Sequence, residues 1–127
     1  MRKVPIISLV LTGEIPSKKN MYRMGNGNFY TPEEVTDWME DIGWQIKSQL
    51  KGRPVIREDC QIAAHFYITK DKDLDNMLNS LFDGLQSAGV INNDKQFQRV
   101  TAAKTVLDKT STTRPHVEVS IEPVMEL

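Results

Sequence analysis

The fold is decided by the stretch CQIAAHFYI (residues 60–68), which runs directly into KDKDLDN (residues 70–76). Apolar and less apolar residues alternate along the first of these, which is the period of a β-strand with one buried face. A helical period follows, in one apolar stripe formed by Leu74, Met77, Leu78, Leu81, Phe82, Leu85 and Ala88. Gly89 suits the position after the helix end. The sequence therefore predicts a buried strand, a short acidic connection and an amphipathic helix.

The chain before this unit predicts a second strand and a second helix. IISLVLT (residues 6–12) is short and rich in β-branched residues, which is typical of a strand. Residues 13–30 are rich in Gly, Asn, Lys and Pro and read as a long loop. TPEE (residues 31–34) is typical of a helix start, with Thr31 as the N-cap. The apolar face of that helix consists of Val35, Trp38, Met39, Ile42 and Ile46.

Two further strands are predicted after Gly89, over 100–107 and 117–121, and residues 109–115 are expected to join them as a hairpin loop. The element order is then strand, loop, helix, strand, helix, strand, strand. This order predicts a single α+β domain over residues 1–127, with a mixed sheet of about four strands and two main helices packed on it.

Composition narrows the class of protein. The chain has 127 residues, 39% hydrophobic and 26% charged, which suits one packed domain. The single cysteine excludes a disulfide framework, and Cys60 is expected to be a buried, unreactive thiol. We find no signal peptide and no stretch able to span a bilayer, so we expect a cytoplasmic protein without membrane contact.

The formal net charge is −1, but the acidic residues of 71–75 and most of the basic residues gather in different parts of the sequence. A near-neutral total can conceal a basic face around an acidic centre. The basic residues outside the acidic stretch are Lys18, Lys19, Arg23, Lys47, Lys51, Arg53, Arg57, Lys95, Arg99 and Lys104.

The acidic connection indicates a metal site. Asp73 and Asp75 share one face if the extended conformation persists through residue 74. Asp94 follows the next helix, and we expect the chain to run back and bring it to the same place. Like charges repel, and Mg²⁺ offsets that repulsion with oxygen ligands. A polar stripe of Asn76, Asn79 and Asp83 is expected beside these carboxylates.

Two simpler interpretations compete. One is that Asp73 or Asp75 caps the helix, which we expect of one of them, although three carboxylates are more than a cap requires. The other is a calcium loop of the EF-hand type, because Asp71, Asp73 and Asp75 match its opening. Asn76 stands where that loop needs Gly, and Phe82 stands where it needs a bidentate Glu, so we reject this interpretation.

Four short motifs follow one another along the chain: DLDN (residues 73–76), FDGL (82–85), AGV (88–90) and NDKQ (93–96). In this order and with these gaps, they resemble the signature of a known family, the RusA-type Holliday junction resolvases. IPSKKN (residues 15–20) is similar to the family's N-terminal Pro-Ser-x-x-Asn loop.

The resemblance implies a homodimeric, Mg²⁺-dependent endonuclease that cuts four-way DNA junctions, with Mn²⁺ as a possible alternative metal. It implies that Asp73, Asp75 and Asp94 are the essential carboxylates. Asn76, Asn79 and Asp83 would support them from nearby. DNA phosphates would be contacted by Lys18, Lys19, Asn20, Arg23, Lys72 and Lys95.

Two departures from the family pattern stand out. The family commonly has Lys one helical turn after the second Asp, where this chain has Asn79, and an acid where it has Asn93. Asn donates hydrogen bonds but carries no charge; Lys70, Lys72 or Lys95 is a possible substitute. Two alternative functions therefore stay open, a junction-binding protein with weak or no cleavage and a general Mg²⁺-dependent nuclease.

Overall fold

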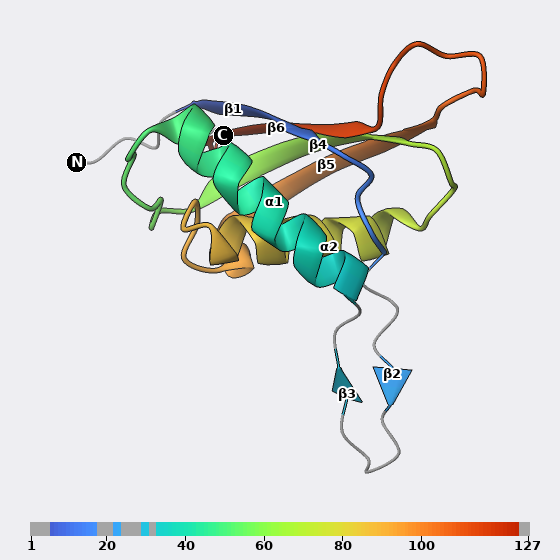
Figure 1. Cartoon of the computed structure of the whole chain (residues 1–127). Coiled ribbons are helices and arrows are strands. Elements are labelled where there is room, and N and C mark those ends of the chain that lie inside the picture. The colour runs from blue at the N-terminus through green and yellow to red at the C-terminus, as the bar shows by residue number, and fades with distance from the viewer. Residues whose placement is uncertain (1–5, 18–21, 24–28, 31–32, 125–127) are drawn as a thin grey trace.

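The computed structural model describes residues 6–17, 22–23, 29–30 and 33–124. It has one layer of sheet with both long helices on the same face (Figure 1), which confirms the predicted α+β architecture. Within these residues, no helix combines the length and the apolar character needed to cross a membrane. The elements are β1 (Ile7–Thr12), β2 (Tyr22–Arg23), β3 (Phe29–Tyr30), α1 (Glu33–Leu50), β4 (Cys60–Ile68), α2 (Leu74–Ser87), the 3-10 helix η1 (Asp94–Gln96), β5 (Phe97–Val106) and β6 (His116–Pro123).

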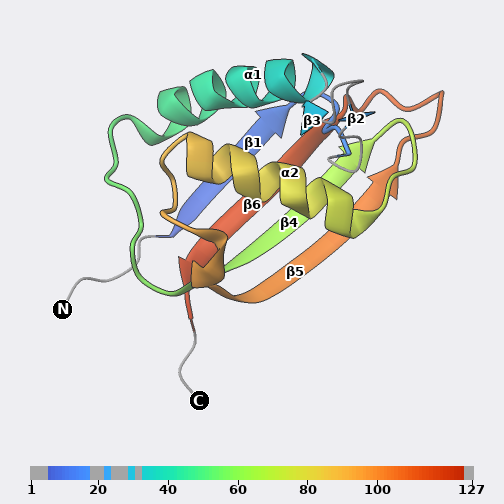
Figure 2. The ribbon, with the colours of Figure 1, turned by 90° about the horizontal axis from the view of Figure 1, so that it is seen from below.

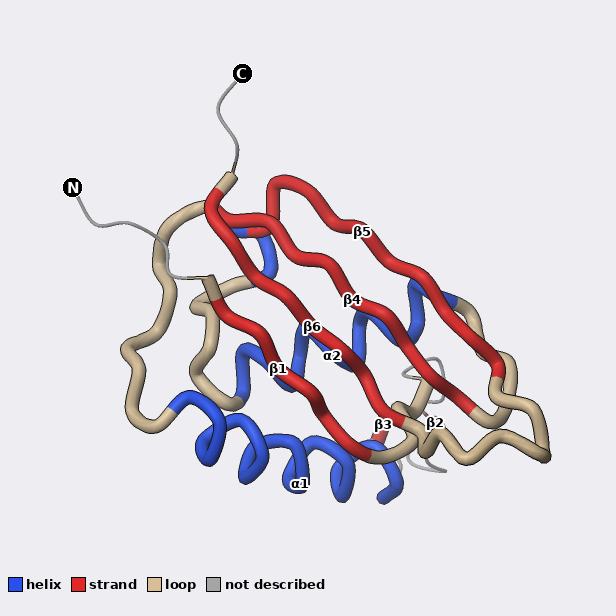
Figure 3. The backbone as a smooth tube through the Cα atoms, turned by 90° about the horizontal axis from the view of Figure 1, so that it is seen from above, coloured by secondary structure: helices blue, strands red, loops and turns tan. Residues whose placement is uncertain are grey.

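The main sheet has the order β1-β6-β4-β5, in which only β4 and β5 are parallel (Figure 3). The predicted hairpin between the last two strands is therefore wrong, because β4 lies between β5 and β6. The cause is α2, which carries the chain back along the sheet so that β5 starts beside the start of β4. Residues 107–115 then cross the end of β4 to reach its other side.

Two smaller differences from the predicted elements follow, and one predicted helix limit lies outside the described residues. The predicted loop over residues 13–30 contains a two-stranded ribbon, β2 paired with β3. β5 begins at Phe97, three residues before the predicted strand. Helix α1 is described from Glu33, so the proposed N-cap Thr31 lies outside the described residues.

The core fills the space between the sheet and the two helices, and the strand alternation decides which residues enter it. Leu9, Phe66 and Val119 point their side chains into this layer from three strands. Ile42 meets them from α1 and Leu81 from α2. Every position on the predicted apolar face of α1 is buried except Met39, which is half-buried.

The two helices approach closely at Gly84 of α2. A Cβ at this position would collide with Cδ1 of Ile42 and lie 3.5 Å from Cζ3 of Trp38. The glycine of the FDGL motif therefore has a packing role, because its missing side chain is what lets α1 and α2 touch.

The two edges of the sheet differ. At the β1 edge, the backbone amide of Val10 donates to Oε1 of Gln49 at 3.1 Å, and Nε2 of Gln49 donates to the carbonyl of Val10 at 2.8 Å. Gln45 does the same at Thr12, at 2.8 and 3.1 Å. Helix α1 thus supplies the hydrogen bonds that a further strand would make. In the part of the chain that is described, β5 pairs with β4 alone and is exposed along most of its length.

Candidate metal and DNA-binding site

Asp73 and Asp75 lie together at the start of α2. Asp73 is the N-cap residue, with extended backbone angles (φ −67°, ψ 135°), yet its side chain makes no capping hydrogen bond. From the described residues, its Oδ2 receives one hydrogen bond, a long one of 3.4 Å from Nδ2 of Asn76. Asp75 accepts the backbone amide of Asn76 at 2.9 Å through Oδ1. Two exposed carboxylates therefore stand at the positive end of the helix, where negative charge is stabilised.

Asp94 does not join them within one chain. Its backbone amide donates to Oε1 of Gln86 at 3.0 Å, close to the C-terminal end of α2. Gln86 lies eleven positions after Asp75 along α2, which corresponds to about 16 Å of axial rise. Figure 2 shows the segment that follows α2 at the opposite end of the helix from the β4–α2 connection. Accordingly, no group of three His, Cys, Asp or Glu side chains among the described residues could surround a metal ion.

Asp94 is nevertheless held in a well-braced turn. The side chain of Asn93 caps η1, and Gln96 completes a capping box with it. Gln96 is buried and accepts the amides of Asn92 and Asn93 at 2.8 Å each, while its Nε2 donates to the carbonyl of Ile56 at 2.8 Å. The turn therefore presents the exposed Asp94 side chain from a rigid backbone.

The polar stripe of α2 lies where the period predicts, with Asn79 exposed and Asp83 half-buried. Between them, Ser80 is fully buried and its hydroxyl donates to the carbonyl of Pro16 at 2.8 Å. The Pro-Ser-x-x-Asn segment therefore begins beside the helix that carries Asp75. Its next residues, Lys18, Lys19 and Asn20, lie outside the described residues, and Arg23 is described only as part of β2.

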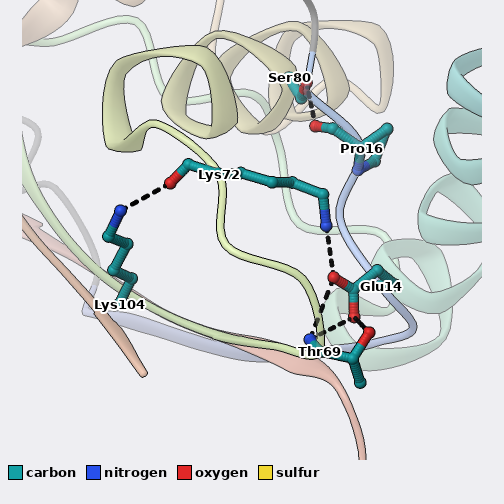
Figure 4. A network of polar contacts seen from close by, with 6 residues as sticks. All are labelled: Glu14, Pro16, Thr69, Lys72, Ser80 and Lys104. Carbon is teal, nitrogen blue, oxygen red and sulfur yellow. Dashed lines mark hydrogen bonds and ion pairs between the residues drawn. The ribbon is translucent and has the colours of Figure 1, made fainter. Parts of the chain in front are cut away.

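The β4–α2 connection is held from two sides (Figure 4). Glu14 accepts the backbone amide of Thr69 at 2.9 Å and forms an ion pair with Lys72. Lys104, on β5, donates to the carbonyl of Lys72 at 2.8 Å and pairs with Asp71 at 2.8 Å. Among the predicted DNA contacts, Lys72 thus has its ammonium group engaged inside the protein, whereas Lys95 is exposed on η1.

These contacts lower the pKa values of two carboxyl groups, those of Glu14 and Asp71. Burial by itself raises the pKa of Glu14, but the bonds from Lys72 and Thr69 outweigh it and leave the pKa below its usual 4.5. The hydrogen bond and charge of Lys104 lower the pKa of the exposed Asp71. By contrast, burial, with smaller effects of Asp59 and Glu58, raises the pKa of Cys60 to about 11, which agrees with the predicted unreactive thiol.

Three residues of this region, Glu14, Ser80 and Gln96, were not among the site residues predicted from the sequence. Glu14 gives no local signal, because its partners Thr69 and Lys72 lie more than fifty positions away. Ser80 gives a weak signal, as a polar residue next to the apolar stripe of α2. Gln96 belongs to the NDKQ motif, but its burial and its four-way bonding follow only from the structure.

A family model and a curated relative both match this chain, and they agree on one family. The family model described as "Endodeoxyribonuclease RusA" matches residues 13–122. The crossover junction endodeoxyribonuclease RusA of Aquifex aeolicus (strain VF5) is 30% identical over 96 residues, which cover 72% of this chain and 74% of that protein. The match includes the connection with Asp73 and Asp75 and the turn with Asp94. This chain therefore belongs to the RusA family of endodeoxyribonucleases.

Proposed function

We propose that the protein resolves four-way (Holliday) DNA junctions with a bound divalent cation, Mg²⁺ or in its place Mn²⁺, held by Asp73, Asp75 and Asp94. The family and the printed name of the relative support the junction as substrate. The observation that carries the metal site is the N-cap of α2, where Asp73 makes no capping bond and Asp75 follows two residues later. Carboxylate oxygens are the ligands that Mg²⁺ prefers, and a few of them suffice.

The three carboxylates require two copies of the chain. Within one copy, Asp94 stands at the far end of α2 from Asp73. A two-fold axis that sets two α2 helices antiparallel would bring the Asp94 of one copy to the Asp73 and Asp75 of the other. A homodimer built in this way has two equivalent sites, which suits a substrate with two strands to cut.

We propose that the dimer forms along the edge of β5 that has no strand partner among the described residues. In the β4–β5 register, Ile68 lies opposite Val106, so the end of β5 lies near the start of the acidic connection. The start of β5 follows Asp94 directly. Two β5 strands paired antiparallel therefore place the Asp94 end of one copy beside the Asp73 end of the other. The pairing would also cover the exposed side chains of Val100 and Val106.

The residues have distinct tasks in this proposal. When bound, the cation would activate water and stabilise the charge that develops on the phosphate. Asp73, Asp75 and Asp94 hold it, and Asn76, Asn79 and Asp83 orient those carboxylates or the substrate by hydrogen bonds. We expect the phosphate backbone of the DNA to be bound by basic and polar side chains. These are Lys18, Lys19, Asn20, Arg23 and Lys95.

A second candidate, a junction-binding protein that cleaves weakly, is supported by Asn79. This residue is exposed one turn beyond Asp75, and it supplies no positive charge. Lys72 is a poor substitute, since its ammonium group pairs with Glu14. We further propose that residues 1–127 act as one endonuclease domain in the cytoplasm, where the DNA substrate lies.

The test is cleavage of a synthetic four-way junction in Mg²⁺ or Mn²⁺, beside a gel shift of the same junction in Ca²⁺ and a linear duplex of equal sequence. We expect cleavage of the junction and little cleavage of the duplex. Asp73→Asn should abolish cleavage and leave binding unchanged or tighter, because it removes a negative charge near phosphate. Binding without cleavage by the wild type would support the second candidate, and equal cleavage of the duplex would support a general nuclease.

A further inference from the structure

The connection between β4 and α2 has to present two carboxylates in a fixed direction. It spans only residues 69–73, and it carries Asp71 and Asp73 immediately before Asp75. These side chains repel one another when no cation is bound. Mg²⁺ also requires nearly ideal octahedral geometry, so carboxylates without a fixed position bind it more weakly. Something other than the carboxylates must therefore hold this backbone in place.

Glu14 restrains the connection from the side of β1. Its Oε1 accepts both the amide of Thr69 at 2.9 Å and the hydroxyl of Thr69 at 3.0 Å. Its Oε2 pairs with the ammonium group of Lys72, whose side chain is only 15% exposed. One carboxylate thus ties the first residue of the connection to the residue that precedes Asp73.

Lys104 restrains the connection from the side of β5. Its ammonium group donates to the backbone carbonyl of Lys72 at 2.8 Å and to Asp71 at 2.8 Å. Figure 4 shows Lys72 stretched between the two, with its side chain reaching Glu14 and its carbonyl facing Lys104. Bonds that involve a charged group are about twice as strong as neutral ones, so this arrangement restrains the residue before Asp73 at both ends.

We propose that Glu14 is a positioning residue of the metal site, which acts through Lys72 and together with Lys104 to fix the direction of Asp73 and Asp75. This inference rests on the proposed function, because it needs a cation at those carboxylates. Glu14 touches neither the cation nor the substrate in this arrangement. Loss of a residue that orients metal ligands typically lowers metal affinity or activity about 10–100-fold.

The variant to test is Glu14→Gln, which keeps the size of the side chain and an acceptor for Thr69 but removes the charge that binds Lys72. Mn²⁺ binding to the free protein, measured by the loss of the free-ion EPR signal, should weaken about tenfold. The half-saturating Mg²⁺ concentration for junction cleavage should rise by a similar factor. Amide hydrogen exchange over residues 69–76 should become faster in the metal-free protein.

Two further variants separate positioning from simple stability. Glu122→Gln is the matched control, because it removes a carboxylate whose partner, Gln61, lies at the other end of β4; it should leave all three readouts unchanged. Glu14→Gln combined with Lys72→Met removes the unpaired ammonium group as well. We expect this double variant to recover melting temperature but not metal affinity, whereas recovery of both would overturn the inference.

The outcomes distinguish this inference from the proposed function. Wild-type cleavage with a Glu14→Gln variant that binds Mn²⁺ normally overturns the positioning role and leaves the nuclease intact. A wild type that neither binds Mn²⁺ nor cleaves the junction overturns the metal-dependent function and this inference with it.

Discussion

The backbone amide of Asp94 donates to the side chain of Gln86, which places Asp94 at the end of α2 opposite to Asp75. The separation of about 16 Å along the helix is far too large for one ion to bridge. Any site that uses both carboxylates therefore takes them from different copies of the chain, and this has direct consequences for mixed dimers.

Mixing two inactive variants should restore cleavage. In a dimer of Asp73→Asn with Asp94→Asn, one site combines both substitutions and the other site is fully wild type. A 1:1 mixture that exchanges subunits should regain about a quarter of the wild-type sites, all of them in dimers that nick one strand. Nicking of a labelled four-way junction measures this directly.

The control for that mixture places both substitutions in one chain and mixes it with wild type. Its mixed dimers should then contain two damaged sites, so that activity falls below that of the same amount of wild type alone. Two results would instead place each site within a single chain. The control mixture would keep the full activity of its wild-type chains, and the first mixture would regain no activity.

A charge on the β5 edge should weaken the dimer. Val100→Lys puts a cation on the edge that we expect two copies to share, and repulsion across the two-fold axis should weaken association at least about tenfold, or about 1.4 kcal/mol. Val10→Lys is the matched control, since Val10 is a similarly exposed valine on the edge already satisfied by Gln49. Sedimentation over a range of concentrations gives both association constants, and equal values would refute the β5 interface.

Two glycine-to-alanine changes should have opposite effects on stability. Gly43→Ala lies in α1 with open space around the new methyl group, so it should stabilise the protein by about 0.5–1 kcal/mol. Gly84→Ala makes the same change on α2 but forces the methyl group against Ile42, and overpacking of this kind costs about 1–3 kcal/mol. Urea unfolding of the two variants should rank them in this order. A Gly84→Ala variant as stable as Gly43→Ala would mean that the helices can move apart freely.

Asn79→Lys should raise the cleavage rate. The side chain is exposed one turn beyond Asp75, so a lysine fits without displacing buried groups and can offset charge on the scissile phosphate. Single-turnover cleavage at fixed Mg²⁺ should become faster with little change in junction affinity. No gain would indicate that Lys70 or Lys95 already supplies the charge, or that the site works without it.

The Glu14 contacts should stabilise the protein only above acidic pH. Because the pKa of Glu14 in the folded chain lies below its usual 4.5, the unfolded chain takes up the proton more readily. The stabilisation is complete above about pH 4.5 and is lost as the pH falls through the lower, folded value. The difference in melting temperature between wild type and Glu14→Gln should therefore shrink on acidification, and a constant difference would argue against a charge effect.

Local periodicity was enough to predict much of this protein from its sequence. The alternation over residues 60–68 and the helical stripe from Leu74 to Ala88 appear at the predicted places, because burial of one face imposes a period of two on a strand and of 3.6 on a helix. The motifs around Asp73 and Asp94 were likewise sufficient to predict the family, since they are short stretches that need no knowledge of pairing.

The tertiary structure decided what lies next to what. Sequence order suggested that β5 and β6 form a hairpin and that Asp94 returns to Asp73, and neither arrangement occurs within one chain. Strand pairing and the partner of Glu14 depend on contacts between residues far apart in the chain, and local patterns carry no information about these. Helix α2 is the physical reason for both differences: as a rigid rod about 21 Å long, it keeps its two ends, and the carboxylates beside them, apart.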